Sequence, residues 1–250
     1  MPSFDRPVYD AITAWGIGSL ALAMSLAWTA VAARRRASYG LGAAALLAGI
    51  AALAWLGDSS GLFARTDILP SPFVLAVTAS IGIGVALAFG KVGDTLVRSM
   101  HIETMVALQI FRLPLELLML RAALLHTMPV EFSLLGYNFD FLTGLGALLI
   151  VLGISRSWVA PVAVIWLWNL LGITCLLVIA ALAALTSPIV HAFGTAPAHL
   201  NTWVLYFPYA LLPLVLVSFA VFGHVLITRK LMADWHFIPH APWTSARDPW

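Results

Sequence analysis

The sequence predicts an all-α polytopic bundle of about seven transmembrane helices, with the N-terminus outside and the C-terminus in the cytoplasm. Hydrophobic residues make up 62% of the 250 residues and charged residues only 10%, whereas soluble domains carry about 25% charged residues. Apolar runs recur at about the 20 residues that a helix needs to cross the hydrocarbon core. Basic residues gather in alternate loops between these runs.

The first three predicted spans are uninterrupted apolar runs, at 11–33, 39–57 and 72–90. The first run is preceded by acidic Asp5 and Asp10, and it lacks the basic start and the A-x-A site of a cleaved signal peptide. We therefore expect it to be retained as a helix. In the third run, Gly82 and Gly84 are expected to let a neighbouring helix approach closely.

The fourth predicted span, 104–126, has the length of a crossing but contains Arg112, Glu116 and Arg121. If it crosses, one set of loops collects nearly all basic residues, namely Arg34, Arg35, Arg36, Lys91, Arg98, Arg156, Arg229 and Lys230. The positive-inside rule makes that side cytoplasmic. Without this crossing, the last basic pair would lie on the wrong side, so the charges favour seven spans over six.

The last three predicted spans are 139–155, 158–186 and 203–228, which complete a membrane domain over 1–230. Gly144 and Gly146 are expected to serve close packing in the first of them. The remaining segment, 231–250, is rich in tryptophan and histidine, as is typical of the headgroup interface. We expect this segment to pack on the bundle or to dock a partner protein. We expect the protein as a whole to lie in a bacterial inner membrane.

The fourth span carries the strongest candidate site, because charges within a bilayer are costly and usually mark function. Gln109, Arg112 and Glu116 are spaced three and four apart and share one helix face. Arg112 and Glu116 can pair along the helix, either as a binding site or as a brace. Pro114 is expected to free the carbonyl of Ile110. Arg121 and His126 are expected to snorkel to the interface.

Two further polar groups join the candidate ligand-binding or structural cluster. Asn138 and Asp140 stand at the start of the fifth span, where Asp140 either caps the helix or faces Arg112 or Arg121 across the bundle. Trp168 and Asn169 lie within the sixth span. They suit either ordinary interhelical packing or a pocket wall.

Several functions are not expected from the sequence. Retinal needs a lysine inside the last span, but Lys230 lies beyond it. Haem needs two facing histidines, and His224, which we expect to be an interface anchor, has only His101 as a partner. No standard metal site or HExxH motif is present, and the few charges do not suit nucleic acid.

The segments around these residues resemble a group of uncharacterised bacterial membrane proteins with seven spans. The resemblance covers roughly 108–231 and includes the R-x-P-x-E string from Arg112 to Glu116 and the G-x-N-F-D string from Gly136 to Asp140. It implies that the two strings belong to one recurring site or brace, and it implies no activity.

Three functions are compatible with this sequence. We favour a protein that binds or transports a small molecule through a polar site in the bundle. The alternatives are a non-catalytic accessory subunit of a larger membrane complex and an intramembrane enzyme that uses Glu116 or Asp140.

Overall fold

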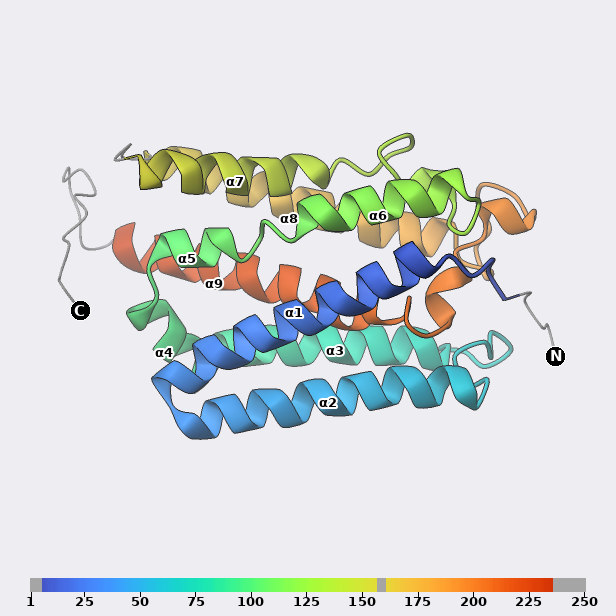
Figure 1. The fold of residues 1–250 in the computed structure, drawn as a ribbon, viewed down its shortest axis with the longest axis horizontal. Coiled ribbons are helices and arrows are strands. Elements are labelled where there is room, and N and C mark those ends of the chain that lie inside the picture. Colours follow the sequence, from blue (N-terminus) through green and yellow to red (C-terminus); the bar gives the residue numbers. More distant parts are fainter. Residues whose placement is uncertain (1–5, 157–160, 236–250) are drawn as a thin grey trace.

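The computed structural model describes residues 6–156 and 161–235, and within them the chain consists of helices and loops (Figure 1). Among these residues, five helical stretches are long and apolar enough to cross a membrane, namely α1 (Ala11–Arg35), α2 (Ala37–Ser59), α3 (Pro72–Phe89), α8 (Val162–Leu185) and Leu212–Ala233. They correspond to five of the predicted spans. The architecture is therefore the helical bundle of an integral membrane protein.

The helix α7 (Phe141–Ser155) is apolar but short, with 15 residues. At about 1.5 Å per residue it is about 22 Å long, less than the ~30 Å hydrocarbon core of a bilayer. It starts at Phe141 rather than at the predicted residue 139, and Asn138 and Asp140 therefore stand just before its first turn.

The predicted continuous helix over 104–126 is wrong, because the structure breaks it into α5 (Ile102–Ala107) and α6 (Arg112–Leu124). Pro114 explains the break, since in a continuing helix its ring would clash with the carbonyl of Ile110. The chain instead makes tight turns, and Leu113 N donates to Ile110 O at 3.0 Å. The Ile110 carbonyl is therefore not free. Pro114 lies in the first turn of α6, where proline is tolerated.

The last predicted span begins later than residue 203. The turn η3 (Trp203–Leu205) is followed by a π-helical stretch, η4 (Leu212–Val217), and then by α9 (Ser218–Trp235). Pro208 and Pro213, which lack backbone N–H groups, account for the delayed start. Within an 18-residue window of Leu212–Ala233, 61% is buried, against 17 to 28% for the corresponding windows of the other four membrane-length helices, so this stretch forms the centre of the bundle.

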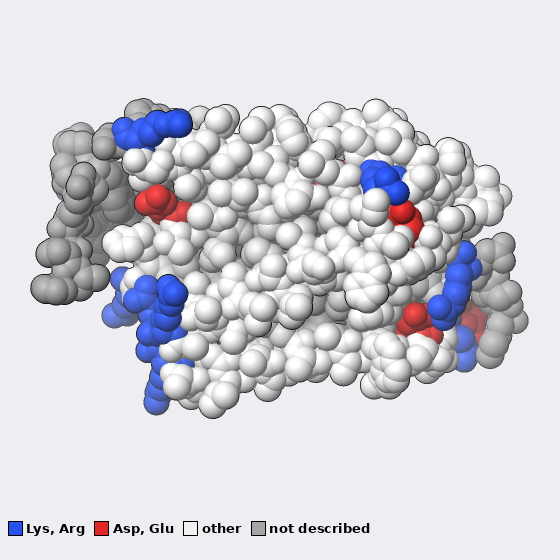
Figure 2. Space-filling view, viewed as in Figure 1, with Lys and Arg blue, Asp and Glu red and all other residues white. Residues whose placement is uncertain are grey.

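The two ends of the bundle differ in charge and structure. At one end, which we call the basic end, lie the α1–α2 turn, α4 (Lys91–Ser99) and the last turns of α7 and α9 (Figure 1). Basic side chains gather there in Figure 2. The opposite end, the loop end, holds the long connections with the short turns η1 (Val130–Phe132) and η2 (Pro197–His199). The start of α1 and the last turn of α9 lie at opposite ends of the bundle.

Glycines shape the packing of α7. A Cβ at Gly144 would lie 2.9 Å from Leu113 N, and one at Gly146 would lie 2.6 Å from Trp168 Cδ1. Both positions therefore need glycine for the helices to approach so closely. Gly84 makes ordinary contact with α9, but Gly82 faces open space, so the contact predicted for Gly82 is wrong.

The predicted boundary between the membrane domain and the tail falls inside a helix, because α9 continues to Trp235. The rest of the predicted aromatic tail, from residue 236 on, lies outside the described residues.

Candidate functional site

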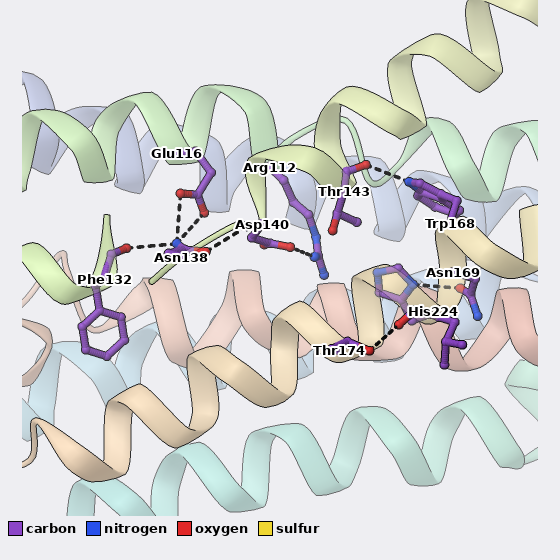
Figure 3. Close-up of polar contacts among 11 residues, drawn as sticks. Arg112, Glu116, Phe132, Asn138, Asp140, Thr143, Trp168, Asn169, Thr174 and His224 are labelled. Carbon is purple, nitrogen blue, oxygen red and sulfur yellow. Dashed lines mark hydrogen bonds and ion pairs between the residues drawn. The ribbon is translucent and has the colours of Figure 1, made fainter. Parts of the chain in front are cut away.

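Arg112 forms an ion pair with Asp140 deep inside the bundle (Figure 3). The side chain of Arg112 is fully buried and Asp140 is nearly so. The partners come from the first turn of α6 and the residue before α7, which approach each other because Gly144 has no side chain. The ion pair confirms one alternative for Asp140. The other is wrong, because its carboxylate caps no α7 N–H group.

Glu116 is bound by Asn138 and forms no ion pair with Arg112. The Asn138 Nδ2 atom donates to both carboxylate oxygens of Glu116 at 2.9 Å and to Phe132 O at 3.0 Å. The Asn138 side-chain oxygen accepts from Asp140 N at 3.0 Å. Asn138 therefore positions both acidic residues. We call Arg112, Glu116, Asn138 and Asp140 the Arg112 cluster.

Two nitrogens of Arg112, Nε and Nη2, have no hydrogen-bond partner within the described part of the chain. Both polar amide atoms of the fully buried Gln109 side chain also have no hydrogen-bond partner among the described residues. A Cβ at Gly223 would overlap the Gln109 amide, so this side chain lies directly on the backbone of α9. Buried donors without partners are rare in native proteins, and each one calls for an explanation.

His224 lies in the core, so its predicted place at the membrane interface is wrong. It is 1% exposed, and its Nδ1 lies 2.8 Å from the side-chain oxygen of Asn169. The Asn169 Nδ2 atom donates to Thr228 Oγ1 at 2.8 Å, which donates in turn to His224 O at 2.9 Å. Asn169 therefore links α8 to α9, which confirms its predicted role as interhelical packing.

The hydrogen bond to Asn169 also determines the tautomer of a neutral His224 ring. Since Asn169 offers an oxygen, a neutral His224 carries its proton on Nδ1 and keeps a lone pair on Nε2. The Nε2 atom has no partner among the described residues. In Figure 3 the Arg112 guanidinium points toward this ring. A Cβ at Gly172 would overlap the ring, so glycine provides the space for it.

Trp168 supports the site from the side. Its indole Nε1 donates to Thr143 O at 2.8 Å, and its ring packs on Gly146. These contacts join α8 to α7 just beyond the Arg112 cluster (Figure 3).

A cavity of about 490 Å³ reaches the Arg112 cluster from the loop end. It lies between α3 and α8, which do not pack closely on each other. Thr66, Ser187 and Asn201 line it near the loop end, and most of its wall is apolar, including Val77, Leu115, Met119, Ile179, Ala183 and Leu216. Arg112, Glu116 and Asp140 are the charged side chains in its wall. We call it the main cavity.

The main cavity includes only part of the predicted cluster. Among the predicted residues, Arg112, Glu116 and Asp140 line it, whereas Gln109, Asn138, Trp168 and Asn169 stand behind its wall. The alternative prediction that Trp168 and Asn169 form a pocket wall is therefore wrong for this cavity. His224 is not among the predicted cluster residues, because it lies near the end of the predicted span 203–228.

Arg121 lies partly exposed at the loop end, where its guanidinium forms an ion pair. Its Nε and Nη2 atoms each donate to the Asp10 carboxylate at 2.8 Å. The Arg121 guanidinium holds the pKa of Asp10 well below its usual range. Asp10 also caps α1 by accepting from Thr13 N at 2.9 Å. This ion pair joins α1 to α6 at the loop end.

The described residues contain no group of three or more His, Cys, Asp or Glu side chains that would hold a metal ion. Comparisons with protein-family models, with curated proteins and with solved structures each gave no match to this chain. The resemblance to a seven-span bacterial group therefore stays a prediction.

Proposed function

We propose that this protein binds a small molecule within its helix bundle, in the main cavity, with a polar group of that molecule against Arg112. The observation that carries the proposal is the pair of buried Arg112 nitrogens without partners, on a side chain that lines the cavity. Leaving a buried donor unsatisfied costs about 1–3 kcal/mol. An oxygen atom of a ligand in the cavity would satisfy these donors.

The lining indicates the class of molecule. A volume of about 490 Å³ lies within the range of ~300–1,000 Å³ of small-molecule sites. Its mostly apolar wall favours an apolar body, and the charged inner end favours one polar group that accepts hydrogen bonds from Arg112. The ligand is therefore an amphiphile with its polar end inward.

We further propose that the chain crosses a bacterial inner membrane seven times, with α5 and α6 together forming the fourth crossing and the loop end outside. The concentration of basic side chains at the opposite end supports this orientation. The main cavity then opens toward the outer side. Transport of the bound molecule stays a prediction.

The proposal is tested by native mass spectrometry of the gently extracted protein. We expect the wild-type chain to retain a small adduct. Arg112→Gln should lose it because the hydrogen-bond donors for the polar end are gone. Arg121→Gln removes an arginine from the same helix outside the cavity, and it should keep the adduct.

A second pair of variants tests the apolar part of the cavity. Ala183→Trp fills it and should abolish the adduct, whereas Ala181→Trp lies on the same helix outside the lining and should not. Each variant is checked for monodispersity and helical content. A bare mass for the wild type, or an adduct that survives both Arg112→Gln and Ala183→Trp, would refute the proposal.

The accessory-subunit and enzyme hypotheses stay predictions. A stoichiometric protein partner in the same mass spectra would favour the first. Loss of a lipid-modifying activity in Glu116→Gln, with the adduct retained, would favour the second.

A further inference from the structure

A second, separate groove lies near the basic end, on the side of the bundle formed by α1, α2, α3 and α9. Its volume is about 290 Å³. The walls are almost entirely apolar, including Leu46, Leu47, Ile50, Ile83, Leu87 and Phe222. Because α2 packs along α1 and makes little contact with α3, the groove lies between two helices that are largely exposed. We call it the α2–α3 groove.

The end of the α2–α3 groove near the basic end is flanked by cations. Ser38 and Tyr39 line it, and the guanidinium of Arg36 lies 5.7 Å from the centre of the Tyr39 ring. On the opposite side, Lys91 lies next to Val92, another lining residue. The groove therefore has a basic residue on both flanks, one from the α1–α2 turn and one from α4.

These cations have no anionic partner among the residues that the structure describes. Arg34, Arg35, Arg36 and Lys91 are exposed, and none of them forms an ion pair with the residues that the structure describes. By contrast, Arg229 at the same end is paired with Asp94 at 2.5 Å. Figure 2 shows the resulting positive patch beside the α1–α2 turn. Unpaired like charges so close together repel one another, and a bound anion would relieve this repulsion.

We propose that the α2–α3 groove binds one anionic phospholipid. One acyl chain lies along the apolar wall between α2 and α3, and the phosphate lies between Arg36 and Lys91, within reach of the Ser38 and Tyr39 hydroxyls. The apolar groove and the basic end are continuous, which selects a lipid over a free phosphate. The excess of positive charge selects an anionic headgroup over a zwitterionic one.

This site is independent of the main cavity. The two share no lining residue, and the α2–α3 groove lies toward the opposite end of the bundle. A failure of the main-cavity proposal therefore leaves this one standing.

The test is a lipid titration of the full-length, delipidated protein, followed by native mass spectrometry. The probes are phosphatidylglycerol and phosphatidylcholine with identical acyl chains. We expect one phosphatidylglycerol to bind in clear preference to phosphatidylcholine. Millimolar inorganic phosphate should not displace it, because phosphate alone cannot use the apolar wall.

Matched variants locate the site. Arg36→Gln with Lys91→Gln should weaken phosphatidylglycerol binding about tenfold or more, since each basic residue at a membrane surface adds attraction for anionic lipid. Arg98→Gln with Arg156→Gln removes the same charge from exposed positions at the same end, outside the groove, and should have little effect. Ala43→Trp places a large side chain within the groove and should block binding. Ala44→Trp changes an exposed neighbour outside the groove lining and should not block binding.

Equal binding of the two lipids would overturn the proposal. So would equal losses in the two double variants, displacement by inorganic phosphate, or full binding by Ala43→Trp. The basic residues concerned are exposed, so their replacement leaves the core unchanged.

Discussion

Arg112 has a demanding position, since its guanidinium is fully buried with one nitrogen paired to Asp140 and two without partners. Removing one member of a buried ion pair costs more than removing both, because the remaining charge is left without compensation. The pair is therefore both a structural link between α6 and α7 and the charged wall of the main cavity.

This asymmetry predicts the outcome of a double-mutant cycle. Arg112→Met alone should lower the free energy of unfolding by roughly 3–5 kcal/mol. Combining it with Asp140→Leu should restore much of the loss. Unfolding in mixed micelles, followed by circular dichroism, measures both values. If the double variant is as unstable as the sum of the single variants, the ion pair does not couple the two helices.

At the scale of elements, α1 and α6 pack through Gly16 and Leu118, and an ion pair joins them at the loop end. The Nε and Nη2 atoms of Arg121 donate to Asp10, which is also the N-cap of α1. Since the Arg121 side chain is 41% exposed, water and salt reach this link.

The Asp10 link predicts a specific loss of stability in acid. Because the pKa of Asp10 is lower in the folded than in the unfolded protein, the folded state binds fewer protons. The link should therefore stabilise fully above the unfolded value of about 3.9, and its contribution should be lost as the pH falls from there through the folded pKa. The difference in melting temperature between wild type and Arg121→Gln should be constant from about pH 7 to about pH 5, and it should begin to shrink below about pH 4.

A variant that conserves the charge controls for the arginine geometry. Arg121→Lys keeps the cation but not the bidentate contact, so it should lie between wild type and Arg121→Gln. A difference between wild type and Arg121→Gln that widens in acid would contradict the assignment of the lowered pKa to Asp10.

Hydropathy predicted the long lipid-facing helices well, since lipid requires apolar side chains and internally satisfied backbones there. It failed at the broken helices, although Pro114 and Pro213 were visible in the sequence, because a window average ignores the missing N–H group. It also misplaced His224. The predicted span ended at residue 228, but α9 continues to Trp235, which places His224 about three turns from the helix end instead of about one.

The candidate site was predictable in part for the same reason. Charges inside an apolar run indicated Arg112, Glu116 and Asp140, and the structure brings these three side chains together in the wall of the main cavity. Their partners were not predictable, because the Arg112–Asp140 and Asn138–Glu116 contacts depend on how α6 approaches the loop before α7. The link between Asn169 and His224 depends likewise on the space left by Gly172.

At the scale of the whole molecule, the side of the membrane on which the later loops lie depends on whether α5 and α6 cross it. In Figure 1 the two follow one another from the basic end to the loop end, so a turn in mid-bundle interrupts the passage without reversing it. If they form one crossing, the loops on either side of them lie on opposite sides of the membrane.

Single-cysteine labelling tests this crossing. The chain has one cysteine, Cys175, which is buried, so Cys175→Ala provides a clean background. Exposed reporters are then placed at the loop end with Ser60→Cys or Leu135→Cys, and at the basic end with Arg98→Cys or Arg156→Cys. An impermeant maleimide added to intact cells should label only the loop-end pair, and the basic-end pair should react after the membrane is opened. If Leu135→Cys reacted together with Arg98→Cys and apart from Ser60→Cys, then α5 and α6 would enter and leave on one side. The bundle would in that case have six crossings, and the charged wall of the main cavity would be carried by a re-entrant segment.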